Sequence, residues 1–204
     1  MSIKLTKNEQ KKQKDALKQY KRYLPTLQLK KKQLQAVIRS VEAEEAALRT
    51  ERAKREAELD SWIALWAENP LFGDKGIETL VVPGKIECKT ENIAGVKVPV
   101  FESLEFVSLD YPLEDYPLWV DRGVESLRDI VVLKAKSTVL KKELDALSHE
   151  LKTTTQRVNL FEKIKIPETE SNIKKISVAI GDASTSAVVR GKIAKKKLLK
   201  EGNA

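Results

Sequence analysis

Residues 17–48 read LKQYKRYLPTLQLKKKQLQAVIRSVEAEEAAL, and their apolar residues recur in alternating steps of three and four. The pattern starts at Leu17 and continues at the same spacing as far as Trp66. A spacing that averages 3.5 residues keeps one stripe of a helix against a partner helix when the two helices supercoil. We therefore expect a left-handed coiled coil whose first helix fills residues 1–68.

Pro25 interrupts this first helix. Proline lacks a backbone N–H and costs about 3 kcal/mol in a helix interior. The apolar spacing nevertheless keeps its phase across the proline, because Leu24 and Leu27 are both in register. We expect Pro25 to bend the helix without ending it.

Residues 119–204 predict a second long helix with the same spacing. Its apolar stripe changes phase after Phe161, next to Pro167, as happens where coiled coils carry an insertion. The expected seam positions before the change are Ile130, Leu133, Ser137, Leu140, Leu144, Leu147, Leu151, Thr154, Val158 and Phe161, and those after it are Ile166, Ile173, Ile176, Ile180, Ala183 and Ala187.

Residues 69–118, between the helices, are rich in proline and glycine, which break helices. Within them, residues 85–106 alternate apolar and polar types on both sides of Asn92, Ile93, Ala94 and Gly95, which predicts a β-hairpin with a four-residue turn. Pro99 is expected at a strand edge, because proline cannot donate to a sheet. The predicted fold class is all-α, a long antiparallel two-helix coiled coil with a small β-hairpin insertion between the helices.

An antiparallel pairing that starts at the hairpin places residue 5 opposite residue 182 or so. The second helix is therefore the longer one. We expect it to extend as an unpaired overhang from about Gly181, where the sequence is poor in strong helix formers.

The net charge of +8 is unevenly distributed along the chain. Residues 1–35 carry +9 and residues 126–204 carry +8, whereas residues 36–125 carry −9. We expect the two basic ends to meet at one tip of a helical rod, away from the acidic hairpin end. The lysines expected side by side at this tip are Lys4, Lys7, Lys11 and Lys12 from the first helix and Lys192, Lys195, Lys196 and Lys197 from the second.

The sequence contains no recognisable catalytic or metal-binding pattern. His149 is the single histidine and is expected to be a solvated helix residue, and Cys88 is the single cysteine and is expected to be a strand residue. We expect no enzyme activity, cofactor or metal. The apolar runs are too short for a membrane span, and no signal peptide is expected.

Another function for the basic residues stays open at this point. The basic runs at Lys11–Lys12, Lys30–Lys32 and Lys195–Lys197 could bind phosphates, so a basic coiled-coil adaptor for nucleic acid or an anionic membrane surface is an alternative function. The runs lack interleaved aromatic residues, which favours a solvated or protein-contacting face.

Trp62, Trp66 and Trp119 are expected to form a local packing cluster at the hairpin end.

Three blocks of the sequence resemble the D subunits of V-type and A-type ATPases. Residues 156–162, QRVNLFE, with Pro167 and residues 172–176, NIKKI, are similar to the C-terminal signature of that family. Residues 92–99, NIAGVKVP, resemble its hairpin, and residues 5–7 with 30–34 are similar to its N-terminal block. The blocks occur in the family's order and spacing, so the resemblance covers nearly the whole chain.

This resemblance implies a non-catalytic central rotor shaft in a peripheral, cytoplasmic complex that couples ATP hydrolysis or synthesis to translocation of H⁺ or Na⁺. The implied partners are the catalytic A and B subunits of the head, the small F subunit on the shaft, and a socket subunit above the membrane ring, without nucleic acid or membrane insertion. The implied interaction residues are the eight tip lysines for the head, Asn92, Gly95 and Pro99 in the hairpin, and Arg157, Asn159, Glu162 and Pro167 on the shaft.

Overall fold

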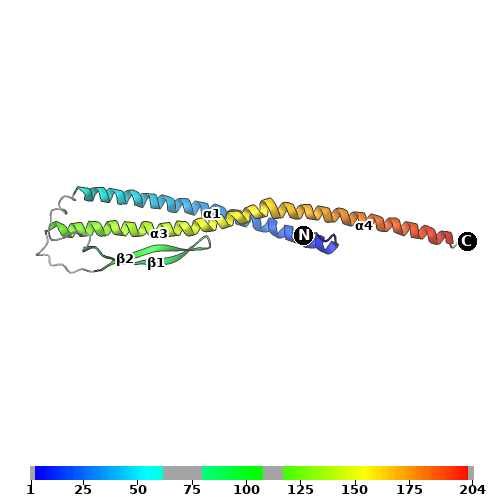
Figure 1. Ribbon diagram of the computed structural model, residues 1–204, viewed down its shortest axis with the longest axis horizontal. Helices are drawn as coiled ribbons and strands as arrows, with labels where there is room; N and C mark the ends of the chain where they lie inside the picture. Colours follow the sequence, from blue (N-terminus) through cyan, green and yellow to red (C-terminus); the bar gives the residue numbers. More distant parts are fainter. Residues whose placement is uncertain (1–2, 62–79, 108–116, 202–204) are drawn as a thin grey trace. The chain divides into compact units, whose positions relative to one another are not determined.

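The computed structural model describes residues 3–61, 80–107 and 117–201, with side chains as far as residue 198. Helix α1 spans Lys7–Asp60, strands β1 and β2 span Pro83–Ile93 and Val96–Phe106, and helix α3 spans Trp119–Asn159. A π-helix, η4, follows at Leu160–Lys165 and leads into helix α4 at Ile166–Glu201 (Figure 1). Of the described residues 80% are helical, so the expected fold class, two long helices with a small hairpin between them, is confirmed.

The chain divides into two compact units, residues 32–152 and residues 1–31 with 153–204. Helix α1 continues through Pro25, so the proline does not end it. Its expected continuation to residue 68 falls outside the described residues, as do Trp62 and Trp66 of the expected tryptophan cluster. Trp119 is described and packs against buried Leu80, Val81, Val120 and Val124.

In the unit of residues 32–152, α1 and α3 run antiparallel and share the predicted seam. The buried residues of α1 are Leu34, Ile38, Val41 and Glu45, which follow the expected steps of four and three. They meet Leu140, Leu144 and Leu147 of α3. Leu34 and Leu147 are fully buried, and burying one such leucine contributes about 1.5–3 kcal/mol.

A carboxylate, Glu45, occupies one position of this otherwise apolar seam. Its side chain accepts two hydrogen bonds of 3.0 Å from Arg49 and one of 3.3 Å from Ser137 of α3, and it lies 3.9 Å from the ammonium of Lys141. The hydrogen bonds from Arg49 are the main reason that the pKa of Glu45 lies below its ordinary value. A lowered pKa means that this network stabilises the fold at neutral pH and loses its contribution as the pH falls through that pKa.

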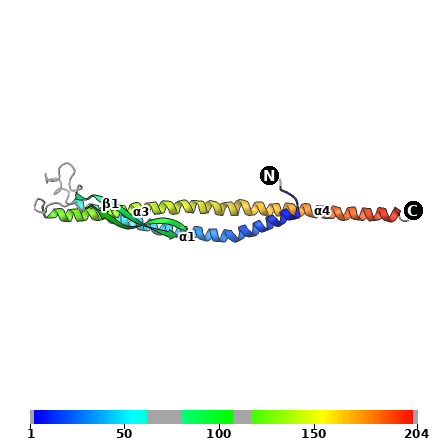
Figure 2. The ribbon, with the colours of Figure 1, turned by 90° about the horizontal axis from the view of Figure 1, so that it is seen from below.

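The hairpin packs along the two helices of the same unit (Figure 2). Val98 of β2 is fully buried and belongs to the same cluster as Leu34, Ile38 and Leu147, so the hairpin tip covers the seam between α1 and α3. Two cations of α3 hold the outer part of β2: Arg128 lies 5.5 Å from the ring centre of Phe106, and Lys136 lies 5.6 Å from that of Phe101. Contacts of this kind contribute about 0.5–1 kcal/mol at exposed sites.

The turn of the hairpin is shorter than the sequence analysis predicted. Ile93 pairs with Val96, so two residues, Ala94 and Gly95, connect the strands in place of the expected four. Both have positive φ, 52° and 80°, as in the two-residue turns whose twist matches that of the flanking strands. Pro99 pairs with Thr90 in a sheet of two strands, where both strands are edges.

The turn predicts opposite effects for two glycine substitutions. Gly95→Ala should destabilise the hairpin by about 1–2 kcal/mol, because a side chain is disfavoured at positive φ. Gly181→Ala is the matched control: it lies in α4, its added methyl group meets nothing within 4 Å, and it should strengthen the helix by about 0.5–1 kcal/mol. Urea unfolding followed by hydrogen exchange of the two segments measures both effects. Equal effects of the two substitutions would contradict the described turn.

Candidate interaction surfaces

The unit of residues 1–31 and 153–204 contains the basic end of the chain. Leu5 lines a groove of about 580 Å³ together with Val178, Ala179 and Asp182 of α4. The expected pairing of residue 5 with residue 182 is therefore observed. From Gly181 to Leu198 every residue of α4 is exposed, which confirms the expected overhang.

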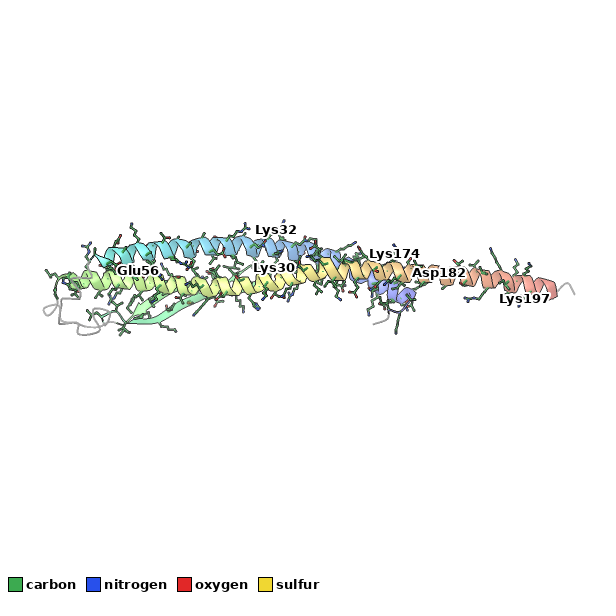
Figure 3. The ribbon with its side chains drawn as sticks, turned by 45° about the horizontal axis from the view of Figure 1, so that its top comes forward. Lys30, Lys32, Glu56, Lys174, Asp182 and Lys197 are labelled. Carbon is green, nitrogen blue, oxygen red and sulfur yellow. The ribbon has the colours of Figure 1, made fainter. Side chains whose placement is uncertain are left out.

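This arrangement corrects the expected lysine tip. Lys4 precedes α1, and Lys7, Lys11 and Lys12 lie in its first two turns. The groove at Leu5 places this end of the chain level with the part of α4 that leads up to Asp182. The lysines Lys192, Lys195, Lys196 and Lys197 lie three to four helical turns further along α4, near the end where Figure 3 labels Lys197. At about 1.5 Å per residue this separation is roughly 15–20 Å. The eight lysines thus form two groups, because the register that gives α4 its overhang also moves its end away from α1.

The exposed stretch of α4 combines positive charge with apolar side chains. Residues 181–198 contain Arg190 and four lysines against one acidic residue, Asp182. Val188, Val189, Ile193 and Leu198 are all about half exposed or more. At 100° per residue they point in three separate directions around the helix. A helix that docked on one flat surface would need a single apolar stripe.

The π-helix η4 lies where the sequence predicts the change of phase. Its wide turn is closed by the Ile166 N–H, which donates to the carbonyl of Phe161 five residues earlier. Val158, Phe161, Lys165 and Thr169 are buried or half-buried, so the two steps after Phe161 take eight residues where the regular spacing of four and three would take seven. The π-helix accommodates this extra residue. It also spares Pro167 a clash with the carbonyl four residues before it.

The seam beyond η4 differs from the expected one. Thr169 and Asn172 are buried in it beside Ile176, whereas Ile166, Ile173 and Ile180 are half-buried. Thr169 satisfies its hydroxyl by donating to the Lys165 carbonyl at 2.6 Å. Counting apolar residues could not find these polar positions.

The four expected shaft residues all lie around η4 and are exposed. Arg157 and Asn159 close α3, Glu162 is in η4, and Pro167 is the second residue of α4. Between them, Leu160 and Ile164 expose 40% and 54% of their surface one turn apart. On the inner side, Phe161 stacks on Tyr20 of α1 with 5.3 Å between ring centres, and Lys21 pairs with Glu170 at 2.7 Å. We define Leu160, Ile164 and the four exposed residues as the η4 surface.

The hairpin offers a different kind of surface. Every residue of β1 before Ile93 is exposed, so this strand has no buried face, although its sequence alternates. Asn92 and Gly95 are exposed at the tip, and Pro99 is half-buried in β2. The charged side chains of β1, Lys85, Glu87, Lys89 and Glu91, discourage pairing of this edge with another strand.

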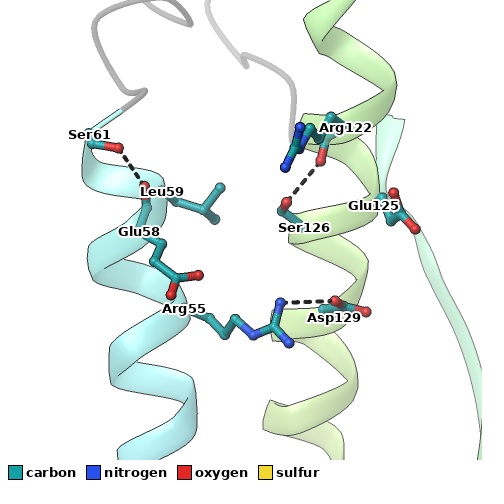
Figure 4. Close-up of a pocket in the computed structure, with 8 residues that line it drawn as sticks. All are labelled: Arg55, Glu58, Leu59, Ser61, Arg122, Glu125, Ser126 and Asp129. Atoms are coloured by element: carbon teal, nitrogen blue, oxygen red, sulfur yellow. Dashed lines mark hydrogen bonds and ion pairs between the residues drawn. The ribbon is translucent and has the colours of Figure 1, made fainter.

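A pocket of about 480 Å³ lies between the end of α1 and the start of α3 (Figure 4). Arg55 of α1 and Asp129 of α3 are paired across it at 3.5 Å. The hydroxyls of Ser61 and Ser126 donate to the backbone carbonyls of Glu58 and Arg122. The Arg55–Asp129 pair connects the two helices, whereas each serine bonds within its own segment. The residues that line this pocket present no nucleophile with an activating base.

Cys88 and His149 lie where the sequence predicts them. Cys88 is a free, exposed residue of β1, and His149 is an exposed residue of α3. Within residues 3–61, 80–107 and 117–201, three or more His, Cys, Asp or Glu side chains nowhere gather in a way that could hold a metal ion. In the same part of the chain, no helix has the length and apolar character needed to cross a bilayer.

Comparison with known proteins identifies the family of this chain. The family model of the ATP synthase D subunit matches residues 9–196. The chain belongs to this family. A V-type ATP synthase D subunit of Borreliella burgdorferi is 45% identical over 199 residues, covering 98% of this chain and 96% of the relative. Those of Chlamydia muridarum and Chlamydia caviae are 37% and 36% identical, cover 96% of this chain, and are themselves covered to 96% and 93%.

Membership of this ATP synthase family confirms the resemblance that the three sequence blocks indicated. The match includes α1, the hairpin, η4 and most of α4.

Because η4 accommodates one extra residue, we expect the protein to tolerate the deletion of one residue there. Removing Ile164 together with Pro167→Ala should convert η4 into ordinary α-helix and leave Thr169 and Ile176 facing the seam, so the protein should still unfold cooperatively. Removing exposed Ser148 from the regular part of α3 is the control. It should rotate Thr154 and Val158 away from the seam by about 100° and cost several kcal/mol. Thermal unfolding by circular dichroism compares the variants, and a similar loss of stability in both would contradict the role given to η4.

Proposed function

We propose that this protein is the central rotor shaft of a V-type or A-type ATP synthase. It transmits rotation between ATP hydrolysis or synthesis in the catalytic head and the translocation of H⁺ or Na⁺ in the membrane ring. Membership of the D subunit family supports this function. The observation that carries the mechanism is the exposed stretch of α4, which is apolar in three directions and basic, as suits a helix surrounded by protein on all sides.

We assign the catalytic A and B subunits to this stretch of α4. An enclosing head covers the apolar side chains that no part of the described chain covers. Carboxylates on its inner wall would attract Arg190 and the four lysines without fixing one rotational position, because exposed ion pairs contribute only about 0–1 kcal/mol each. Nucleotide chemistry belongs to the head, and the shaft itself acts without a cofactor and is not an enzyme.

The two remaining surfaces are assigned to the other partners. The small F subunit is proposed to bind the η4 surface, where Leu160 and Ile164 provide apolar contact and Arg157, Asn159 and Glu162 provide polar contact. The hairpin end, with Asn92, Gly95, Pro99 and the exposed strand β1, is proposed to serve coupling at the socket subunit above the membrane ring. The shaft then belongs to a cytoplasmic, peripheral part of the complex.

The alternative function, a basic adaptor for nucleic acid or an anionic membrane surface, explains fewer observations. An adaptor on a membrane surface needs one apolar stripe, whereas the apolar residues of α4 point several ways. Binding to phosphates would also leave the η4 surface and the hairpin without a role.

Rotation can be tested by a reversible cross-link in the assembled complex. With Cys88→Ser as background, Val189→Cys joined by a disulfide to a cysteine in the inner wall of the head should stop ATP hydrolysis, and reduction should restore it. A disulfide between Leu160→Cys and the small F subunit joins two parts that turn together, so hydrolysis should continue at its normal rate. Undiminished hydrolysis with the head cross-link would refute rotation of this shaft.

The charge on α4 can be tested by reversing lysines in groups of four. Changing Lys192, Lys195, Lys196 and Lys197 together to Glu should slow assembly with the catalytic head, and more so at low salt, where screening is weak. The control reverses Lys4, Lys7, Lys11 and Lys12, which lie several turns back from the end of α4, and should have a smaller effect. Stopped-flow or native gel analysis of assembly at two salt concentrations measures the difference. Equal rates for both variants would remove the role of this charge in docking.

A further inference from the structure

Glu143 of α3 is a buried carboxyl in the apolar part of the molecule. Only 4% of its surface is exposed. Val139 and Leu147, one turn away on either side, are buried as well, and Leu147 belongs to the cluster that the hairpin tip covers. A carboxylate in such a place loses much of its hydration, which disfavours the charged form.

The charges that act on Glu143 from neighbouring elements are both negative. They are Glu44 of α1 and Glu91 of β1. Glu91 is the cross-strand partner of Val98, which belongs to the same buried cluster as Leu147, one turn from Glu143. Among the described residues of α1, α3, β1 and β2, no basic side chain forms an ion pair with Glu143. Lys141 pairs with Glu45, and Lys89 pairs with Glu91 at 3.7 Å.

Burial first, and then the repulsion from Glu44 and Glu91, raise the pKa of Glu143 above its ordinary value of 4.5. Glu143 lies on α3 between two residues that contact β2: Lys136 lies over the ring of Phe101, and Leu147 shares a buried cluster with Val98. If the hairpin moved off the helices, Glu91 would move away and Glu143 would become more exposed to water. The docked hairpin therefore holds the proton of Glu143 more tightly than an undocked one would.

We propose that Glu143 is a proton-dependent latch, which holds the hairpin on the helices when protonated and weakens that hold when it ionises. Its operation requires the juxtaposition of α1, α3 and β1 around one carboxyl group and does not depend on the function proposed above.

The direction of the pH effect follows from the linkage between docking and protonation. Well below pH 4.5 the carboxyl is protonated whether the hairpin is docked or not, so docking carries no electrostatic cost. As the pH rises from 4.5 through the raised pKa, the undocked form ionises first, and docking becomes weaker. Above that pKa the weakening is complete and constant. Any partner that competes for the covered faces of the hairpin and helices would then bind more readily at higher pH.

The latch can be tested on the full chain by measuring amide hydrogen exchange of residues 96–100 from about pH 4.5 to about pH 8, corrected for the intrinsic exchange rate at each pH. An isolated two-stranded hairpin is at best marginally stable, so undocking should expose these amides. Wild-type protection should fall several-fold across the window, because ionisation of Glu143 then opposes docking. Glu143→Gln should remove this fall and should be better protected than wild type at the upper end of the window.

Two further variants make the test specific. Glu102→Gln removes an exposed carboxyl from β2 and should follow the wild-type profile. Glu91→Gln keeps Glu143 but removes one source of repulsion, so the fall should be smaller and centred at a lower pH; because Glu91 is exposed, this variant reports even if Glu143→Gln folds poorly. Protection that does not change with pH in wild type, or an unchanged fall in Glu143→Gln or Glu91→Gln, would overturn the proposal.

Discussion

The register between α1 and α3 is fixed by the polar contact of Glu45 with Ser137 in the middle of an apolar seam. An apolar repeat alone would allow one helix to slide along the other by a whole turn. Glu45 resists such a shift, because it would lose the Ser137 hydrogen bond and the nearby Lys141 and keep only Arg49 of its own helix while staying inside the seam. Removing partners from a buried carboxylate is costly. Polar residues at seam positions fix register in this way in other coiled coils.

The position of the hairpin on the two helices depends on this register. Val98 packs where Leu34 of α1 and Leu147 of α3 come together, and a shift of one turn would separate those two leucines. The hairpin is therefore part of the core of its unit as well as a surface. Strand β2 packs inward and belongs to the core, whereas β1 is exposed and forms the surface.

Much of this architecture can be predicted from the sequence because it follows from periodicity. The steps of three and four located the seam, the change of phase after Phe161 located η4, and the alternating residues located the hairpin. The overhang of α4 followed from counting residues outward from the turn. These features depend on patterns that extend over many residues, so no single exception obscures them.

The features that could not be predicted depend on particular contacts between distant residues. The sequence does not reveal that Glu143 would meet Glu44 and Glu91, because their convergence requires the hairpin to fold back onto both helices. The buried Thr169 and Asn172 were missed because polar residues do not count toward an apolar stripe. The lysine tip was wrongly placed because charge was summed over segments, whereas the positions of Lys4 and Lys192 are set by register.

The exposed end of α4 also affects how susceptible the protein is to proteolysis before it is assembled. A lone helix of this length in water is only marginally stable, because it gains nothing from tertiary packing, and Gly181 and Gly191 lower its helical preference further. Residues 181–198 are thus the part of α4 most accessible to proteases while the chain is free. Enclosure of these residues by the catalytic head, as proposed above, would block cleavage. The same stretch would let a cell remove surplus copies of the chain while sparing those already incorporated.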